Sequence, residues 1–172
     1  MNSLKVTSPR NTVGMTQFYE AASKMQANIF MANETCLDTT KSNVRALTKQ
    51  VSAQYWRSFY NRPYLIHSTS SVCPSRTFSK PGGNLIGLVD NITGRFLTRI
   101  SDPYGRWCGF VLHGKDQRQI LFLIAYQVPY NSSPSDTTLQ AQQHSLYRMH
   151  NIRNPNPRKL FIEALERLVT NY

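Results

Sequence analysis

A carboxylate that follows an apolar stretch near the N-terminus is the first feature of this sequence that could do chemistry. Residues 29–35 read IFMANET, so four apolar residues pass directly into Asn33, Glu34 and Thr35. This pattern is typical of a buried parallel strand whose C-terminal end delivers a side chain to the crevice where ligands bind in open α/β sheets. Glu34 in that place could hold a metal ion or a proton. Alternatively, it could simply stabilise the start of a following helix.

The composition indicates a basic globular chain. The sequence has 172 residues, of which 40% are hydrophobic and 17% charged, and this fits one folded domain over residues 1–172 with a sizeable core. Twenty Lys and Arg against nine Asp and Glu give a formal net charge of +11. Such an excess points to a polyanionic partner, with nucleic acid ahead of a membrane surface. A basic protein without a polyanionic partner is the alternative.

Cysteine usage and hydropathy favour an intracellular chain with no membrane partner. Cys36, Cys73 and Cys108 are too few and too far apart for a disulfide framework or a zinc site. The N-terminus has no apolar core of signal-peptide length. The longest apolar run, residues 120–126, is far too short to span a bilayer.

Apolar spacing and turn signals predict an α/β fold in which helices and strands alternate. Helices are expected at residues 15–26, 43–56, 139–150 and from 157 onward, and strands at 29–32, 64–67, 84–89, 96–100, 108–113 and 119–128. The last two strands should form a hairpin, and the almost continuously apolar segment 119–128 should be central in its sheet. Asn156 before Pro157 predicts an N-cap and a first-turn proline for the last helix.

Five short motifs follow one another along nearly the whole chain. They are Asn-Glu-Thr at 33–35, Pro-Gly-Gly at 81–83, Asp-Pro-Tyr-Gly-Arg-Trp at 102–107, Ala-Tyr-Gln-Val-Pro at 125–129 and Asn-Pro-Asn-Pro-Arg at 154–158. In this order the motifs resemble the endonuclease/exonuclease/phosphatase family. More narrowly, they are similar to the DNase I-like endonuclease domains encoded beside reverse transcriptases in retrotransposon-type elements. The resemblance implies a DNase I-like four-layer α/β sandwich, with two mixed sheets packed face to face between helices.

The resemblance also implies a set of catalytic residues. In that family the glutamate of the Glu-Thr motif binds a divalent cation, usually Mg²⁺ and here with Mn²⁺ as the alternative, and Glu34 matches it. A tyrosine at the end of a central strand reaches the scissile phosphate, and Tyr126 matches that position. Such a cation neutralises charge on the phosphate oxygens, and a phenol donates to the same group without adding charge. Asn2 matches only the second half of the family's first motif, whose first partner would lie before Met1.

Two motifs of the family are missing from the sequence. A Gly-Asp-x-Asn strand, which supplies an aspartate for the nucleophilic water, and a Ser-Asp-His motif for acid–base work should follow the last helix, but the sequence stops at Tyr172. In-line attack on a phosphodiester needs an activated water, a cation and a stabilised leaving group held together. We therefore expect an incomplete domain, truncated at both ends, with impaired or no activity. The alternative is that a partner chain supplies the missing groups.

Basic and aromatic residues near strand ends and turns extend the hypothesis to a nucleic-acid surface. The candidates are Arg95, Arg99, Arg106, Lys115 and Arg118 for the phosphate backbone, and Trp107 and Tyr104 for stacking on bases. Scattered basic residues on loops are also ordinary features of a solvated surface.

The sequence thus leads to one main hypothesis and two alternatives. The main one is a magnesium-dependent endonuclease domain that cleaves DNA phosphodiesters, attached to a reverse transcriptase in a longer parent protein, with a nuclear location if the retrotransposon interpretation holds. The first alternative is a non-catalytic basic module that binds nucleic acid through electrostatics alone. The second is a phosphoesterase of the same fold that acts on small phosphate esters or lipid phosphates.

Overall fold

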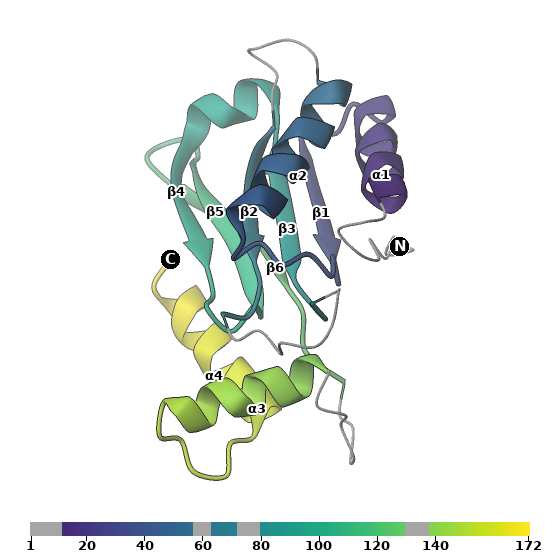
Figure 1. Ribbon diagram of the computed structural model, residues 1–172. Helices are drawn as coiled ribbons and strands as arrows, with labels where there is room; N and C mark the ends of the chain where they lie inside the picture. The colour runs from purple at the N-terminus through teal and green to yellow at the C-terminus, as the bar shows by residue number, and fades with distance from the viewer. Residues whose placement is uncertain (1–11, 57–62, 72–79, 130–137) are drawn as a thin grey trace.

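Two antiparallel three-stranded sheets packed face to face form the centre of this computed structural model, which describes residues 12–56, 63–71, 80–129 and 138–172 (Figure 1). The first sheet has the order β1-β3-β2, with β1 at Ile29–Asn33, β3 at Asn84–Leu88 and β2 at Tyr64–Ser68. The second has the order β4-β5-β6, with β4 at Phe96–Ser101, β5 at Trp107–His113 and β6 at Gln119–Ala125.

Helices lie on one outer face and at both ends of this pair of sheets (Figure 1). They are α1 at Thr12–Lys24, α2 at Ser42–Tyr55, the 3-10 helix η2 at Asp90–Arg95, α3 at Leu139–Met149 and α4 at Pro157–Thr170. α1 and α2 cover the outer face of the first sheet, and α3 and α4 lie at the end of the sheets where β1 and β6 finish. Mixed α/β architecture is therefore confirmed. None of the helices in the described ranges combines the length and the apolar character that crossing a bilayer requires.

Aromatic packing joins α1 and α2 to the first sheet. The Tyr19 ring is fully buried and stands edge-on to Phe30, with centroids 5.8 Å apart, and Phe30 stacks on Trp56 with centroids 5.2 Å apart. Such aromatic pairs stabilise a core beyond the area that they bury. Gly87 lies opposite Phe30 in the sheet, and a Cβ at this position would come within 2.2 Å of the Phe30 ring. Glycine is required there because the ring lies flat on the strand.

Alternate side chains of β3 and β5 fill the space between the two sheets, as the two-residue period of a strand requires. Ile86 and Leu88 from β3 share one core cluster with Cys108, Phe110 and Leu112 from β5, and none of these five side chains is more than 4% exposed. The sheets are therefore held together by a dry apolar layer.

The prediction that residues 29–32 form a parallel strand buried on both faces is wrong. β1 runs antiparallel to β3, beginning with Ile29 opposite Leu88. It is an edge strand of its sheet, and its burial alternates, since Ala32 is buried while Met31 is 37% exposed. The four apolar residues of β1 therefore alternate between a strand face that is fully buried and a strand face that is partly exposed to solvent.

The prediction that the segment 119–128 is central in its sheet is also wrong. β6 ends at Ala125, pairs with β5 alone among the described strands, and leaves Ile120 42% exposed. The predicted hairpin between β5 and β6 is confirmed. All strand pairs in the described part of the chain are antiparallel, so the two sheets are not mixed there.

A buried ion pair in the turn between β4 and β5 fixes α3 and α4 to the sheets. The Arg106 guanidinium donates through Nη2 to Asp102 Oδ1 at 2.8 Å and through Nε to Asp102 Oδ2 at 2.9 Å. Its Nη1 donates to the Tyr147 hydroxyl of α3 at 2.9 Å and to the Leu160 carbonyl of α4 at 3.2 Å. A single side chain therefore joins one turn to two helices that follow much later in the chain.

The start of α4 agrees with the sequence prediction. The Asn156 side chain accepts a hydrogen bond from the Lys159 backbone N–H at 3.2 Å, and Pro157 occupies the first turn, where its missing N–H costs nothing.

Replacing the arginine of this ion pair should destabilise the chain strongly. We expect Arg106→Gln to lower the free energy of unfolding by about 3–5 kcal/mol, because Asp102 would be left as a buried charge without its partner. Urea denaturation of the whole chain measures this change. Arg118→Gln, which removes the same charge from an exposed side chain, should change the free energy by less than about 0.5 kcal/mol. Equal effects of the two substitutions would show that the ion pair has no special role.

Candidate functional site

Glu34 and Tyr126 meet at one edge of the sandwich, although they are 92 positions apart in the sequence. β1 is an edge strand of the first sheet and β6 is an edge strand of the second, and the two strands are neighbours. Glu34 follows the last residue of β1, and Tyr126 follows the last residue of β6. The Tyr126 hydroxyl donates a short hydrogen bond to Glu34 Oε1. The structure therefore brings together the two site residues that motif similarity predicted at strand ends.

Glu34 has a left-handed backbone conformation that sets the direction of its side chain, and hydrogen bonds to the Pro-Gly-Gly motif hold the following residues in place. The backbone φ of Glu34 is 52°, a conformation that is uncommon for residues other than glycine and that clusters at functional sites. The Thr35 and Cys36 N–H groups donate to the carbonyls of Gly83 and Gly82, at 3.2 and 2.8 Å. A Cβ on Gly83 would come within 2.7 Å of Thr35 Oγ1. Glycine at this position thus serves the placement of Glu34, a role that sequence reasoning missed.

The Tyr126 hydroxyl is held in its protonated form. Burial of the ring raises the pKa of Tyr126 above its ordinary value, and the hydrogen bond to the Glu34 carboxylate raises this pKa further. Both side chains are partly buried, so the contact lies at the surface of the sandwich edge, within reach of a ligand. Tyr126 is therefore a neutral hydrogen-bond donor across the whole physiological pH range.

Neutral oxygen atoms without partners lie on the strand residues beside Glu34. Asn33 and Asn84 face each other across β1 and β3. Both Oδ1 atoms are buried and have no hydrogen-bond partner in the described part of the chain, and the same holds for Thr35 Oγ1. Asn84 Nδ2 donates to the Gly105 carbonyl at 2.9 Å, so its amide nitrogen is engaged while its oxygen is free. Sequence reasoning missed these two amides, since nothing in the residue type shows whether the amide oxygen will be unpaired.

This donor set fits a magnesium ion that shares its coordination with a substrate. Mg²⁺ prefers oxygen ligands and is commonly held by one or two carboxylates together with water and substrate phosphates. Glu34 supplies the carboxylate, and the amide oxygens of Asn33 and Asn84 are of the right chemical kind. Within the described ranges, no three His, Cys, Asp or Glu side chains come together as a metal-binding group. Any cation here would thus depend on neutral oxygens for its remaining protein ligands.

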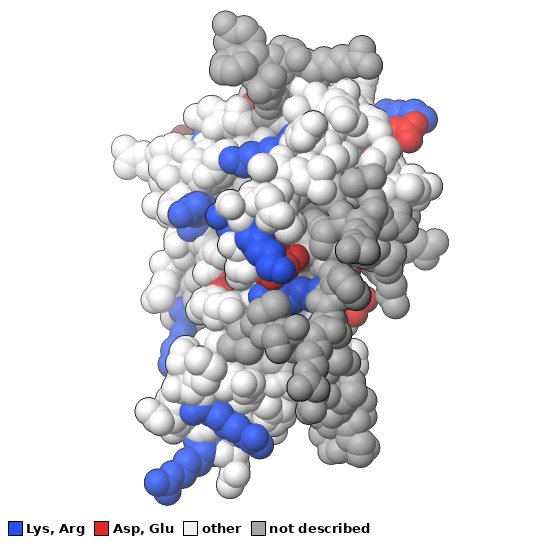
Figure 2. Space-filling model, in the orientation of Figure 1, with Lys and Arg blue, Asp and Glu red and all other residues white. Residues whose placement is uncertain are grey.

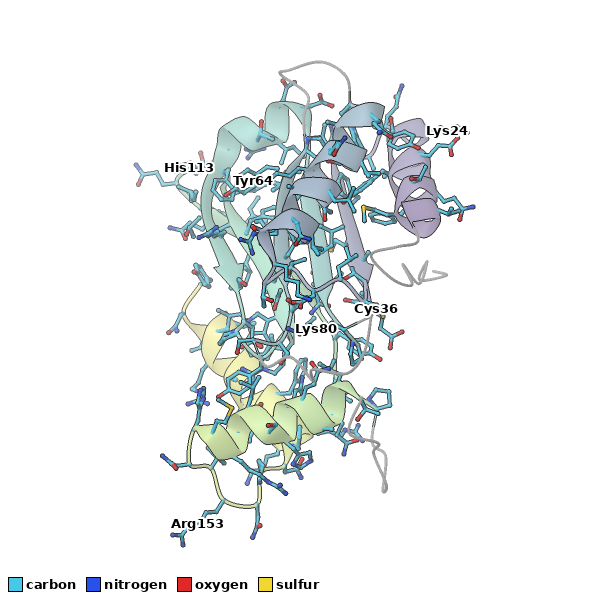
Figure 3. The ribbon with its side chains drawn as sticks, in the orientation of Figure 1. Lys24, Cys36, Tyr64, Lys80, His113 and Arg153 are labelled. Atoms are coloured by element: carbon cyan, nitrogen blue, oxygen red, sulfur yellow. The ribbon has the colours of Figure 1, made fainter. Side chains whose placement is uncertain are left out.

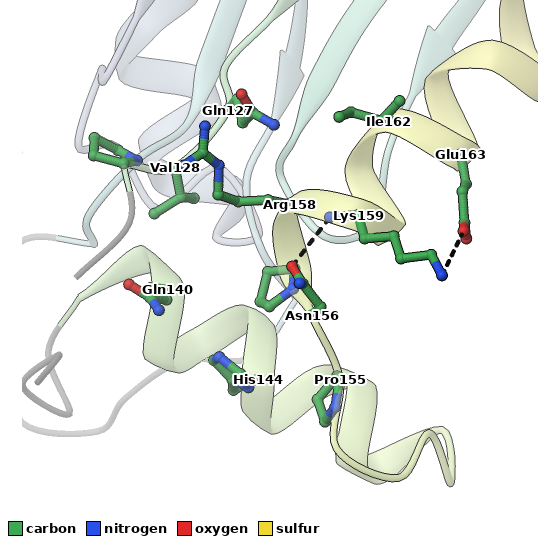
Figure 4. Close-up of a pocket in the computed structure, with 12 residues that line it drawn as sticks. Gln127, Val128, Gln140, His144, Pro155, Asn156, Arg158, Lys159, Ile162 and Glu163 are labelled. Atoms are coloured by element: carbon green, nitrogen blue, oxygen red, sulfur yellow. Dashed lines mark hydrogen bonds and ion pairs between the residues drawn. The ribbon is translucent and has the colours of Figure 1, made fainter. Parts of the chain in front are cut away.

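A cavity of about 850 Å³ opens beside the end of β6 (Figure 4). Gln127, which follows Tyr126, lines it together with His144 of α3 and with Arg158 and Lys159 at the start of α4. Figure 4 shows the Arg158 side chain extending toward the segment after β6, and the Asn156 cap at the base of α4. Positive charge in the cavity that Gln127 lines suits a phosphate-bearing ligand.

The loop after Glu34 is anchored by a second buried ion pair. Lys80 Nζ lies 3.3 Å from Asp38 Oδ1, and the Lys80 side chain is almost completely buried. Burial tends to raise the pKa of Asp38, but the hydrogen bond from Thr40 and the charge of Lys80 together lower it below its ordinary value. The residue just before Pro-Gly-Gly is thus tied to the segment that follows Glu34.

Two predicted nucleic-acid contacts are corrected by the structure. Arg106 is only 5% exposed and its guanidinium is engaged by Asp102, Tyr147 and Leu160, so it is not free to contact a phosphate backbone. Trp107 is 6% exposed, packs against the α4 core, and lies 4.2 Å from the Arg106 guanidinium. Its ring has no open face on which a base could stack.

The remaining basic candidates are exposed but lie away from Glu34. Arg95 donates through Nε to the His113 carbonyl at 2.8 Å, and Lys115 follows in the turn between β5 and β6. The seven residues of β6 separate this turn from Tyr126, a distance of roughly 23 Å at the usual rise per residue. Arg95 and Lys115 therefore do not share a surface with the site. Asn2, the third predicted catalytic residue, lies outside the described residues.

No family model matches the sequence, and no curated protein matches it. Membership of the endonuclease/exonuclease/phosphatase family therefore stays a prediction, carried by the five motifs and by the contact between Glu34 and Tyr126.

Removing the Tyr126 hydroxyl should leave the Glu34 carboxylate without its partner. We expect Tyr126→Phe to lower the free energy of unfolding by about 1–3 kcal/mol, because a partly buried acceptor would lose its donor. In a Glu34→Gln background the same substitution should cost much less, since the interaction energy of a pair is measured by a double-mutant cycle. Tyr172→Phe at an exposed position is the control and should have no effect. Additive effects of the two substitutions would contradict the contact.

The ion pair between Lys80 and Asp38 should make the free energy of unfolding fall at acid pH, where Asp38 becomes protonated. The lowered pKa means that the stabilising effect of Asp38 is complete above the ordinary carboxyl value of 3.8 and is lost as the pH falls through the lower folded value. Asp38→Asn should therefore cost about 3 kcal/mol or more at pH 7, where Lys80 would be left buried and unpaired. Denaturation from pH 7 down to pH 2 measures this, and the difference from the unaltered chain should shrink below pH 3.8. A difference independent of pH would contradict the role of the ion pair.

Proposed function

We propose that the chain is a DNase I-like domain whose site at the β1 and β6 edge belongs to a Mg²⁺- or Mn²⁺-dependent phosphodiester hydrolase acting on DNA. The observation that carries the proposal is the contact between Glu34 and Tyr126, because it joins a carboxylate and a phenol from two different sheets at the positions that the motifs predict. The packing of α1 and α2 on the first of two face-to-face sheets supports the fold part of the proposal.

The proposal assigns cation binding, hydrogen bonding to a phosphate oxygen and binding of the DNA backbone to different side chains of the site. Glu34 would hold the cation, with the Asn33 and Asn84 oxygens as neutral neighbours. A bound cation would withdraw charge from the phosphate oxygens during attack. Tyr126, which stays protonated, donates a hydrogen bond to a phosphate oxygen and adds no charge of its own. The basic cavity with Arg158 and Lys159 accommodates the adjoining part of the DNA backbone.

The same reasoning limits the expected activity. The sequence lacks the Gly-Asp-x-Asn and Ser-Asp-His motifs, and these would supply the aspartate that activates water and the acid–base pair. The residues of this chain bind a cation and a phosphate, and impaired or absent turnover is expected. A reverse transcriptase in the parent protein and a nuclear location follow from the retrotransposon part of the resemblance alone.

A non-catalytic nucleic-acid-binding module is the second candidate, and the charge distribution favours it. In Figure 2 Lys and Arg side chains spread over the face formed by α2 and the strands beside it, with few acidic side chains among them. The formal charge of +11 gives this face a long-range attraction for phosphate backbones. This candidate needs no cation, so its binding would be steeply salt-dependent and indifferent to Glu34.

Plasmid nicking separates the two candidates. Supercoiled DNA is incubated with the whole chain in Mg²⁺, in Mn²⁺ and in EDTA, and relaxed circles are counted on a gel. If the site works, Glu34→Ala and Tyr126→Phe should each slow nicking by about 100-fold, because each removes a group that stabilises the transition state. Glu166→Ala removes an exposed carboxylate of α4 that does not line this cavity, and it should leave the rate unchanged.

The remaining outcomes are equally informative. Absence of nicking together with DNA binding that Glu34→Ala does not alter would support the binding module and reject the hydrolase. Nicking that survives EDTA or Glu34→Ala would also reject the proposed site.

A further inference from the structure

A second basic cavity lies on the opposite edge of the sandwich from Glu34. β2 and β4 are the edge strands on that side, as β1 and β6 are on the other. The cavity measures about 650 Å³ and is formed by one face of α2, by β2 and by β4. Ten described residues line it, among them Arg45, Lys49, Tyr64, His67 and Arg99. Three of these ten are permanent cations and none is acidic.

Three cations from two elements converge on this cavity. Arg45 and Lys49 are four residues apart on α2 and therefore lie on the same helix face, and Arg99 comes from β4. Arg45 is anchored by a bond of 2.9 Å from Nη1 to the Thr40 carbonyl. Lys49 and Arg99 are exposed, and neither forms an ion pair with any of the described residues. Unpaired cations that face one cavity repel one another unless an anion occupies it.

His67 adds an unused hydrogen-bonding group to the same cavity. Its Nδ1 is enclosed and has no hydrogen-bond partner among the residues that the structure describes, which is costly for a buried polar atom. Burial lowers the pKa of His67 to about 4, and the positive charges of Arg45 and Lys49 add to this effect. The ring is therefore neutral at pH 7, and one of its nitrogens carries a hydrogen that an anionic oxygen could accept.

An aromatic surface borders the cations. Tyr64 is 42% exposed, and its ring is steadied from one side by Phe96, with centroids 4.8 Å apart. Figure 3 shows Tyr64 at the end of the sheets away from Cys36, which follows Glu34 by two residues. A partly exposed ring next to a cluster of cations is the combination that single-stranded nucleic acids use, with bases on the ring and phosphates on the cations.

We propose that this cavity binds one nucleotide unit of a single-stranded nucleic acid. Arg45, Lys49 and Arg99 neutralise the phosphate, His67 donates a hydrogen bond to one of its oxygens, and the base stacks on Tyr64. The site lies on the opposite edge from Glu34 and takes no part in chemistry there. It provides affinity, and it does not depend on whether the chain hydrolyses DNA.

Fluorescence anisotropy with a labelled single-stranded DNA 12-mer tests this proposal, with EDTA present so that hydrolysis cannot interfere. Lys49→Gln with Arg99→Gln removes two charges from the cavity, and Arg148→Gln with Arg153→Gln removes two from exposed residues at the α3 end of the molecule, away from Tyr64 (Figure 3). We expect the first pair to weaken binding about 10-fold at ~0.1 M salt and to reduce the slope of log K against log salt by about 1.4. The second pair should weaken binding less than about 2-fold. Equal losses would mean that only net charge matters, and would overturn the site.

Two further measurements separate the parts of the site. Tyr64→Leu should weaken binding of the 12-mer at least about 5-fold and leave binding of inorganic pyrophosphate unchanged, because pyrophosphate has no base to stack.

Nuclear magnetic resonance of the His67 ring should show a change in its chemical shifts on addition of the 12-mer. Unchanged chemical shifts of the His67 ring would overturn the assignment. Adenosine monophosphate is tested as a second ligand. If it binds as tightly as the 12-mer, the ligand is a free nucleotide and the proposal is overturned. Thermal melting of each variant checks that the fold is retained.

Discussion

The buried ion pair between Asp102 and Arg106 is the interaction on which one whole end of this molecule depends. Two opposite charges taken out of water are tolerated only when their remaining hydrogen-bonding groups are satisfied as well. The turn that carries the pair meets this condition by recruiting its neighbours. The Arg106 N–H donates to Asp102 Oδ2, the Ser68 hydroxyl donates to the Asp102 carbonyl, and the Tyr126 N–H donates to the Arg106 carbonyl. The same turn therefore orders β2, the exit of β6 and, through the guanidinium, α3 and α4.

This network also explains why the candidate site lies where it does. Tyr126 is held by the Arg106 backbone and Asn84 by the Gly105 carbonyl, so two groups of the site are placed by one turn. Glu34 is placed independently, by its left-handed backbone and by the Pro-Gly-Gly segment. The short bond between the Tyr126 hydroxyl and Glu34 thus joins two separately built frameworks.

Local patterns in the sequence predicted the elements well, but not their positions in the sheets. The β5–β6 hairpin and the Asn156 cap depend on near neighbours, and both are confirmed. Strand direction and centrality depend on partners that are distant in the sequence. The apolar runs at the positions of β1 and β6 were therefore compatible with central strands, although both are edge strands. Residue type likewise does not report exposure, and so Arg106 and Trp107 were predicted on the surface although both are buried.

The bond between Tyr126 and Glu34 has a mechanical consequence, because the core between the two sheets that it spans is apolar, and apolar packing by itself has no direction. Sliding one sheet along the other by a single residue, about 3.3 Å, would pull the hydroxyl out of reach of the carboxylate. The hydrogen bond between Tyr126 and Glu34 therefore forms only in one relative register of the two sheets. The Tyr126 hydroxyl and Glu34 Oε1 come within hydrogen-bonding distance only when the side chains between β3 and β5 are packed in this register. Formation of the site is therefore coupled to formation of the core.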